Sequence, residues 1–464
     1  MSEASNRSFA IGHNSLARSK DAFDRAKAVL PGGTTRVTVQ RDPAPIYMAQ
    51  GRGAWLTDLD GNRYLDLNNN YTTLIHGHAF EPVVSAVEQQ VRAGSCYANP
   101  TEHEVAHAEI LCERVPAVER VRYVSTGTEA VMFAVKAARA ITGRTKIAKL
   151  EGAYHGGYDW VEVSESSTPE TWGGHEPASV PFARGTPPSV LDQVIVVPLN
   201  DSQTTAELLE RHAEELACFV VDLVPSRAGL MPLEPDYLET VREITRRHGI
   251  ILISDEVLNF RQGYHGAAAR FGLEPDLIAL GKIIGGGLPI GAIGGSADLM
   301  TVFDNSTTEP DLPQGGTFSA NPLSMVAGIA SLQALDRAAF DRLEHLGARV
   351  RAGLERAIAD RGLPITVTGS ASLFRVHLKP QAPQSYREAW PTTVEQQVLK
   401  GMSWFMLDRG VILPALSSSS LSTAMTDDDI DFFLASFAEL LDTEGVRGWS
   451  ARQAIQGHME DNRV

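Results

Sequence analysis

The sequence has few cysteines, a deficit of basic residues and no long apolar run. None of its three cysteines forms a CxxC pair, so we expect no disulfide framework and no metal site, and expect Cys96, Cys112 and Cys218 to pack in a reducing compartment. Apolar runs are all shorter than the roughly 18 residues of a transmembrane helix, so we expect no membrane contact. Lys and Arg number 41 against 57 Asp and Glu, a formal charge of −16. This balance argues against sequence-independent nucleic-acid binding, which requires a basic surface.

The N-terminal stretch also lacks a targeting signal. Its first fourteen residues, MSEASNRSFAIGHN, contain no apolar segment like that of a secretory signal, so we expect a cytoplasmic protein. Across 464 residues, 43% are hydrophobic and 21% charged, which is typical of a soluble globular chain. That length suffices for a large core and for two domains that share one active site.

Between residues 118 and 295, short apolar runs alternate with helical segments such as Thr128–Ile141 and Tyr237–His248. The runs are nearly continuous rather than alternating, as in parallel strands that are covered on both faces. This pattern predicts an α/β fold with a mainly parallel seven-stranded sheet. The predicted strands are Val121–Val124, Ile147–Leu150, Val194–Val197, Phe219–Leu223, Ile250–Ile253, Leu277–Leu280 and Ile290–Ile293.

The two ends of the chain predict a second, smaller unit. Residues 54–67 look like a hairpin with its turn at Asp60-Gly61-Asn62, and the region after 335 mixes amphipathic helices with short strands such as Ser372–Leu378. We therefore expect an N-terminal segment (1–70), a large α/β domain (71–335) and a C-terminal segment (336–464), with both end segments contributing to a small α+β domain. Residues 164–190 are predicted to form a loop, either near the mouth of the site or disordered at the surface.

Three local features follow predicted strands. Ser125–Ala130 (STGTEA) opens a helix, where free backbone N–H groups, Gly127 and the Thr128 hydroxyl favour an anion site, although an ordinary capped helix would look similar. Tyr154 lies between glycines, so it can stack on a planar ring or simply pack in a turn. Asp255 ends another strand, where it can pair with a pyridinium nitrogen or cap the next segment.

The fourth feature is Lys282, which follows an apolar strand and precedes Gly285-Gly286-Gly287. Apolar neighbours would desolvate its amine and lower its pKa, making it a nucleophile for a carbonyl group. The alternative is a lysine that extends from a glycine-rich loop into solvent. Taken together, a phosphate site, a ring-stacking tyrosine, a pyridinium partner and this lysine match the needs of pyridoxal 5′-phosphate (PLP), held as a Schiff base.

The sequence resembles the class III aminotransferases of PLP fold type I, close to glutamate-1-semialdehyde aminomutase and the β-amino-acid aminotransferases, over about residues 25–440. The resemblance rests on these segments: PGGTTR at Pro31–Arg36, NPTE at Asn99–Glu102, STGTEA at Ser125–Ala130, TGRTKIAKLEGAYHGG ending at Gly157, DEV at Asp255–Val257, GKIIGGGLPIGAIGG at Gly281–Gly295 and GGTFSANP at Gly315–Pro322.

The resemblance implies an obligate homodimer with shared active sites. It implies the following roles: Lys282 forms the Schiff base and moves protons, Asp255 pairs with the pyridine nitrogen, Tyr154 and Val257 pack on the two ring faces, Gly127 and Thr128 bind the phosphate, and Thr317 reaches the phosphate of the neighbouring subunit. Arg36 resembles the carboxylate-binding arginine of β-amino-acid aminotransferases, although a surface arginine in an N-terminal loop would look the same.

Two segments depart from the family. Arg227 stands near the place where relatives carry an amide beside the cofactor's 3-oxygen; it would lower the pKa of the Schiff base or bind a substrate carboxylate. Leu413–Met425 contains neither the arginine that relatives use for 2-oxoglutarate or pyruvate nor the acidic residue that is usual in the aminomutases.

These observations predict a PLP-dependent transaminase that moves an amino group between an amine or amino acid, including a β-amino acid, and a keto acid or aldehyde. An isomerase on the same scaffold, either an aminomutase of the glutamate-1-semialdehyde type or an amino-acid racemase, would use the same cofactor residues and stays open. A nucleotide-binding α/β protein without catalysis is a third possibility, but STGTEA is neither a GK[ST] P-loop nor a GxGxxG fingerprint.

Overall fold

The structure of the protein is a computed structural model that describes residues 15–39, 41, 44–306, 309–416 and 418–461, with side chains described as far as residue 453. The N-terminal stretch from which we expect no secretory signal lies outside the described residues. Within the described part of the chain, no helix is long and apolar enough to cross a membrane. The same residues contain no group of three or more His, Cys, Asp or Glu that could hold a metal ion.

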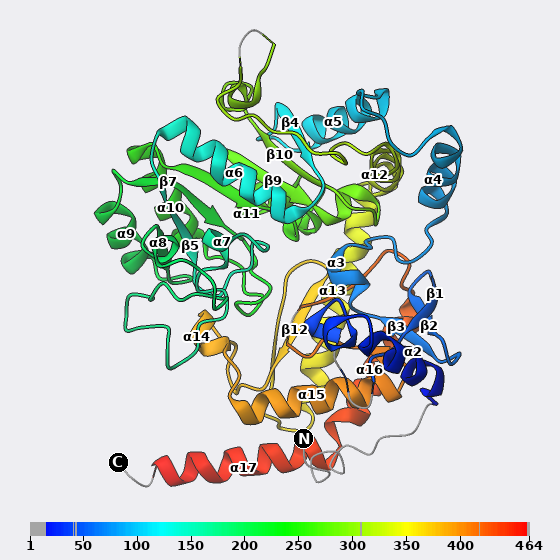
Figure 1. The fold of residues 1–464 in the computed structure, drawn as a ribbon. Helices are drawn as coiled ribbons and strands as arrows, with labels where there is room; N and C mark the ends of the chain where they lie inside the picture. The colour runs from blue at the N-terminus through cyan, green and yellow to red at the C-terminus, as the bar shows by residue number, and fades with distance from the viewer. Residues whose placement is uncertain (1–14, 40, 42–43, 307–308, 417, 462–464) are drawn as a thin grey trace.

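A seven-stranded sheet forms the centre of the molecule, with the strand order β4-β10-β9-β8-β7-β5-β6 (Figure 1). The strands are β4 (Arg120–Val124), β5 (Lys146–Leu150), β6 (Val194–Val197), β7 (Leu216–Val221), β8 (Ile251–Asp255), β9 (Leu277–Gly281) and β10 (Gly291–Gly295). The α/β prediction is confirmed, and each predicted strand overlaps one of these. β10 runs antiparallel to both of its neighbours. An apolar run indicates burial on both faces and carries no information on strand direction, so this reversal could not be predicted.

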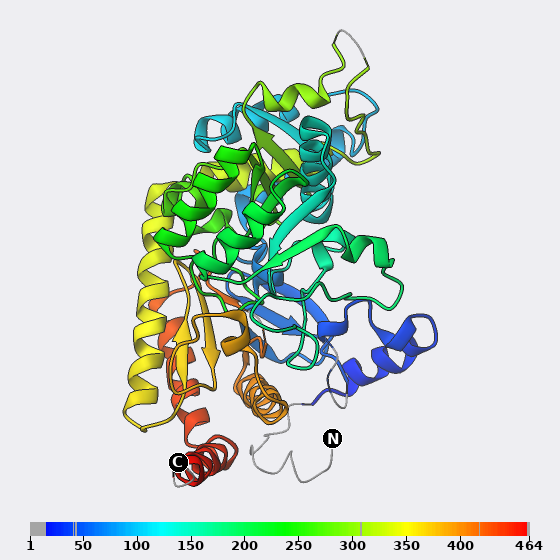
Figure 2. The ribbon, with the colours of Figure 1, turned by 90° about the vertical axis from the view of Figure 1, so that its left-hand side faces the viewer.

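Both faces of the sheet are covered by helices, as Figure 2 shows. Side chains alternate along each strand: Leu277 and Ala279 of β9 join the cluster beneath α6 (Gly127–Thr142), whereas Ile278 and Leu280 join the cluster on the opposite face. That opposite face is covered by α5 (Glu102–Arg114), α10 (Pro235–His248), α11 (Gly266–Phe271) and α12 (Pro322–Ala334). Burial on both sides explains why β7, β9 and β10 carry no charged residue, whereas the edge strand β4 carries Arg120 and Arg122.

Both ends of the chain build smaller sheets beside the large one. The predicted hairpin is present: β2 (Trp55–Asp58) pairs antiparallel with β3 (Arg63–Asp66). The four-stranded sheet β1-β2-β3-β13 adds β1 (Met48–Arg52) and the C-terminal β13 (Val411–Ile412), while β11 (Thr366–Thr368), β12 (Leu373–His377) and β14 (Ser419–Ser420) form a second sheet. The exact division of the chain at residues 70 and 335 stays a prediction.

Long C-terminal helices pack against these small sheets. The long helix α13 (Arg337–Ala359, yellow in Figure 2) links the two parts, because Phe340 and Leu343 pack with the large sheet and Leu346 to Ile358 with the small sheets. The remaining longer helices are α2 (Ala17–Lys27), α4 (Glu81–Ala93), α9 (Ser202–Arg211), α15 (Thr393–Asp408), α16 (Asp427–Leu441) and α17 (Glu444–Asp461).

Two local expectations differ from the structure. Cys218 is buried and Cys112 is half-buried, but Cys96 is exposed and does not pack in the core. The predicted loop at 164–190 is largely irregular up to the short helix α8 (Pro188–Leu191), yet Trp172 packs edge-on against Tyr386 of α14 (Tyr386–Ala389) and against Trp390. This long-range aromatic contact fixes the loop and is not visible in the local sequence.

Candidate active site

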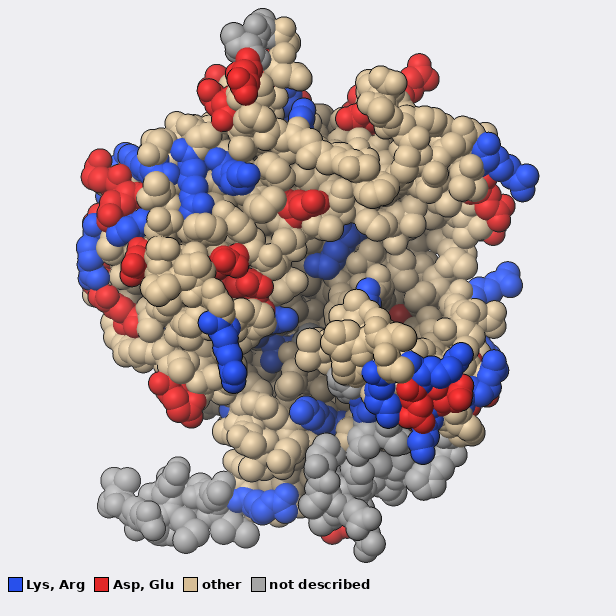
Figure 3. Space-filling view, in the orientation of Figure 1, with Lys and Arg blue, Asp and Glu red and all other residues tan. Residues whose placement is uncertain are grey.

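Most of the predicted cofactor residues follow strands that end at one edge of the large sheet. Because β5, β7, β8 and β9 are parallel, their carboxyl ends meet there, where open α/β sheets bind ligands. β4 points the same way, since it is antiparallel to β10, which is antiparallel to β9. In the face shown in Figure 3, the surface is hollowed between the large sheet and the small sheets, and Lys and Arg atoms lie in this hollow.

Lys282 is the first residue after β9 and begins the short 3-10 helix η4 (Lys282–Gly285). Its φ angle is +47°, a left-handed conformation that is rare for a residue with a side chain and that often marks a functional turn. Burial lowers the pKa of its amine, while the charges of Asp255 and Asp222 raise that pKa and the charge of Arg261 lowers it. The amine is therefore easier to deprotonate than an exposed lysine.

Asp255 ends β8 and is buried, with 5% of its surface exposed. Its Oδ1 accepts a hydrogen bond from the backbone N–H of Val257 at 3.0 Å, and its Oδ2 lies 2.7 Å from Nδ1 of His155. Burial lowers the pKa of His155, and its Nε2 has no partner among the described residues. A neutral imidazole that donates its Nδ1–H to the carboxylate fits these contacts, because a charged ring would bury an unpaired Nε2–H.

The N-terminus of α6 faces the same edge. Thr126 caps the helix by accepting the backbone N–H of Glu129, and a Cβ on Gly127 would lie 2.5 Å from Cγ1 of Val257. Only a glycine therefore lets the helix approach Val257 without a shift. The Thr128 hydroxyl accepts the backbone N–H of Gly157 at 3.3 Å, so the STGTEA segment and the loop that carries Tyr154 lie against each other.

Tyr154 lies beside Arg227 rather than in a closed core. Tyr154 is 44% exposed, and the Arg227 guanidinium lies over its ring at 4.7 Å from the ring centre. Arg227 also forms an ion pair with the buried Glu165, whose pKa is raised by burial and lowered by Arg227 and Lys149. The predicted influence of Arg227 on Lys282 stays a prediction, since the charges that act on the Lys282 amine are Asp255, Asp222 and Arg261.

Arg36 is exposed and contacts the turn that follows β3. Its Nη1 donates to Oδ1 of Asn70 at 3.2 Å, and its guanidinium lies 5.3 Å from the centre of the Tyr71 ring. Four consecutive residues, Asn69 to Thr72, have positive φ angles, which is an unusual run for residues with side chains. A run of this kind is maintained by its surroundings and often occurs at ligand sites.

Thr317 is exposed in the loop before α12, as is the neighbouring Phe318. No contact in the single chain joins Thr317 to Lys282 or Gly127 among the hydrogen bonds of the described residues, so its role across a dimer stays a prediction.

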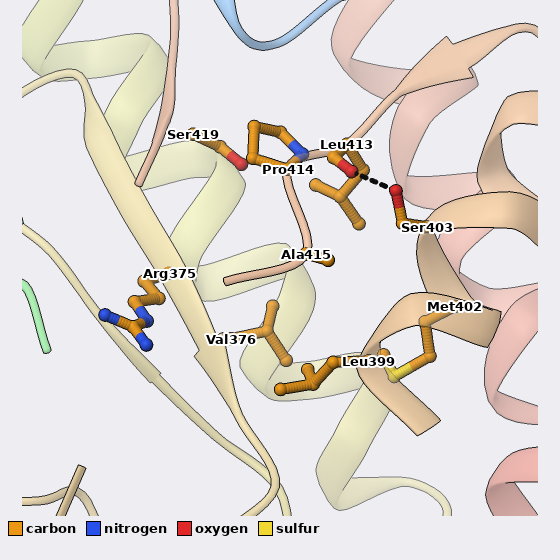
Figure 4. Close-up of a pocket in the computed structure, with 9 residues that line it drawn as sticks. All are labelled: Arg375, Val376, Leu399, Met402, Ser403, Leu413, Pro414, Ala415 and Ser419. Carbon is orange, nitrogen blue, oxygen red and sulfur yellow. Dashed lines mark hydrogen bonds between the residues drawn. The ribbon is translucent and has the colours of Figure 1, made fainter. Parts of the chain in front are cut away.

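The segment that departs from the family lies beside the strand β12. Ser418 shares a hydrogen bond with Ser226 at 2.8 Å, whereas Ser417 lies outside the described residues. Figure 4 shows the small pocket next to this segment, in which the Arg375 guanidinium points away from the other lining side chains. Arg375 donates instead to the backbone oxygens of Ser226 and Arg227. No side chain that lines this pocket is acidic.

The sequence did not assign a role to His155, Asp222 or Arg261. His155 stands in the quoted AYHGG segment, but its contact with Asp255 joins the loop after β5 to the end of β8. Asp222 directly follows β7, as Asp255 ends β8, and this shared position was the available signal. Arg261 is fully buried and donates to Thr72 O at 3.2 Å, to Ser372 Oγ at 3.1 Å and to Leu421 O, so it joins the large sheet to the small ones.

Comparisons with known proteins agree with this arrangement. A glutamate-1-semialdehyde 2,1-aminomutase of Methanothermobacter thermautotrophicus is 38% identical over 429 residues, covering 91% of this chain and 99% of the relative. An omega-transaminase from Sphaerobacter thermophilus has a TM-score of 0.90 and 46% identity, covering 93% of this chain and all of that one. A β-phenylalanine aminotransferase from Variovorax paradoxus has a TM-score of 0.84 and 32% identity, covering 94% of this chain and 96% of that one.

The family assignment follows from the length of the match as well as from the site. Residues 37–425 match the family described as Aminotransferase class-III. This range includes every strand of the large sheet and every predicted cofactor residue from Gly127 to Thr317. The chain belongs to the class III aminotransferase family.

Proposed function

We propose that the protein is a PLP-dependent aminotransferase that moves an amino group between an amine or amino acid and a keto acid or aldehyde. The observation that carries the proposal is the position of Lys282, a partly desolvated amine in a left-handed turn at the end of β9, beside the buried Asp255 at the end of β8. The proposal also rests on membership of the class III family.

The residues at the sheet edge fit PLP. Asp255 offers a buried carboxylate for the pyridine nitrogen, Tyr154 offers an exposed ring face, and Val257 is half-buried on the next turn. Gly127 and Thr128 at the start of α6 offer backbone N–H groups and a hydroxyl for the phosphate. When bound, PLP would supply an electron sink for the carbanion at the substrate's amine-bearing carbon.

Side chains of the protein would then take separate roles in the reaction. Lys282 Nζ would take the proton from the amine-bearing carbon, a task for which its lowered pKa is suited. Asp255 would keep the pyridine nitrogen positively charged, and His155 would hold that carboxylate in place through the 2.7 Å contact. The buried Arg261 would keep the turn at Thr72 and the small sheets against the site.

We propose that Arg36 binds the carboxylate of an amino-acid substrate, including that of a β-amino acid. Arg36 is exposed, and its hydrogen bond to Asn70 uses only Nη1, so much of the guanidinium edge is accessible. Arg227 is the second candidate for binding a substrate carboxylate. Its side chain is 37% exposed, but its guanidinium already pairs with Glu165. Of the two, Arg36 is the better carboxylate site, because it has no acidic partner among the described residues whereas Arg227 pairs with Glu165.

An isomerase is the second candidate, because the curated relative that is 38% identical is named as an aminomutase. The structures with higher identity include an omega-transaminase at 46%. Leu413–Met425 has no acidic residue of the kind usual in the aminomutases, which favours the transaminase.

Visible absorbance of the purified protein with bound PLP separates the two. We expect one class of amine, added without any acceptor, to remove the band of the cofactor linked to Lys282 and a keto acid to restore it. A band that persists with every donor, together with turnover that needs no keto acid, would instead identify an isomerase. Lys282→Ala is the control and must abolish the response.

We also propose a homodimer in which Thr317 contributes to the partner's phosphate site. The exposed Phe318 beside it is consistent with burial against a second copy. Sedimentation of the holoenzyme should give a dimer, and Thr317→Ala should weaken PLP retention without changing the sedimentation coefficient. A monomer that retains PLP and activity would contradict this.

A further inference from the structure

We propose that Asp222 is held in the site as a neutral carboxylic acid and that its Oδ2 donates a hydrogen bond to the bound cofactor. This deepens the proposed function and rests on it where the cofactor is concerned. Asp222 directly follows β7, whose Val221 pairs with Ser254 of β8, so Asp222 and Asp255 lie side by side at the sheet edge.

The side-chain hydrogen bonds of Asp222 with other described residues all go to one of its two carboxyl oxygens, Oδ1. Its Oδ1 accepts the backbone N–H of Val224 at 3.0 Å and also the side-chain amide of Asn259. Asn259 is itself fixed, because its own oxygen accepts from Gln262 at 3.2 Å. No hydrogen bond to Oδ2 is recorded among the described residues, which leaves that atom free to carry a proton and to donate it.

The surroundings of Asp222 disfavour a second negative charge. Asp222 is buried, with 5% of its surface exposed, and it forms no ion pair with any described Lys or Arg. The facing charged groups are Asp255 and Lys282, of which the first raises and the second lowers the pKa of Asp222. Burial is the largest effect and raises that pKa well above its usual value. Of the two acids, Asp255 is better stabilised in its charged form, because His155 and the Val257 N–H both contact its carboxylate.

A neutral acid here has a chemical use. A carboxylic acid donates one hydrogen bond without adding charge, so it can serve a polar oxygen of the cofactor while leaving the charge of Asp255 as the one that acts on the pyridine nitrogen. Arg227 is engaged by Glu165 and Tyr154, so it does not compete for this task in the structure.

The first test uses the protein without cofactor and compares Asp222→Asn with wild type by urea unfolding between pH 5 and 8. The folded-state pKa of Asp222 is raised above its unfolded value, so its contribution to stability is present at low pH and is lost as pH rises. Asn cannot titrate. We therefore expect the unfolding constant of wild type, relative to Asp222→Asn, to rise about tenfold per pH unit until the folded-state pKa is reached.

A ratio that stays flat over this range would overturn the proposal, since it would mean that Asp222 is already ionised in the folded protein. Asp298→Asn, which removes an exposed carboxylate, is the matched control for the loss of one carboxylate.

The second test uses the visible band of the holoenzyme as a function of pH. Asp222→Asn keeps a neutral donor, so we expect the midpoint of the band's titration to change by less than about 0.3 pH unit, whereas Asp222→Leu should shift the band and speed the loss of PLP. A shift of about one unit or more in Asp222→Asn would show that a charge was removed and would overturn the proposal. If PLP does not bind at all, the proposed function fails, while the cofactor-free test still decides the state of Asp222.

Discussion

Gly127→Ala tests the close approach of α6 to Val257. The added Cβ would lie 2.5 Å from Cγ1 and 3.1 Å from Cγ2 of Val257, whereas carbon atoms pack best at about 3.5 to 4.0 Å. Val257 is β-branched, so turning it about χ1 cannot easily relieve both contacts. Overpacking of this kind costs about 1 to 3 kcal/mol, and we expect Gly127→Ala to weaken PLP binding by about 5- to 150-fold.

The double variant Gly127→Ala/Val257→Ala isolates the cause. Removing both Cγ atoms of Val257 eliminates the two short contacts, so the double variant should be no worse than Val257→Ala alone. PLP affinity is measured by absorbance titration, and thermal unfolding of the cofactor-free protein follows the packing separately. If the two substitutions prove additive to within about 0.5 kcal/mol, the contact with Val257 is not what makes glycine necessary.

Three further predictions concern single side chains. His155→Leu leaves the buried Asp255 Oδ2 without its partner, which costs about 1 to 3 kcal/mol. PLP should therefore dissociate faster from this variant than from wild type, and His155→Asn should recover part of the loss. Equal dissociation rates in His155→Leu and wild type would refute the role of His155 in holding Asp255. Burial raises the pKa of Glu256 to about 7, so the stability that the protonated Glu256 contributes is lost as pH rises from about 4.3 towards 7. The Tm of Glu256→Gln should therefore rise relative to the Tm of wild type across that window and not above it. A Tm difference that stays constant with pH would refute the raised pKa. Arg36→Gln should raise KM for amino acids about tenfold or more and leave simple amines unchanged, with the exposed Arg25→Gln as control; an equal effect on both substrate classes would exclude a carboxylate contact.

The sequence predicted the parts of the molecule that depend on local composition. Most strands of the large sheet were visible because burial on both faces demands an apolar run, and Lys282 and Asp255 were visible because they interrupt or end such runs. The antiparallel β10 was not visible, since strand direction is decided by connections and packing.

The contacts between separate segments were also beyond the sequence. His155 reaches Asp255 across 100 positions in the chain, and Arg261 reaches Leu421 across 160. The left-handed run at Asn69 to Thr72 contains no glycine, and although asparagine tolerates this conformation, the residue types of Tyr71 and Thr72 do not indicate it. The state of Asp222 depends on burial and on its neighbour Asp255, both of which exist only in the folded protein.

The central claim is that Lys282 holds the cofactor, and borohydride reduction tests it most directly. Reduction of the PLP-loaded protein fixes the cofactor to the lysine that binds it, and peptide mass spectrometry locates the label. We predict a label on Lys282 alone. Lys149 is the internal comparison: it is fully buried, its pKa is lowered to about 8, and it donates to three backbone oxygens. A label on Lys149 or on surface lysines, with Lys282 unmodified, would contradict the account.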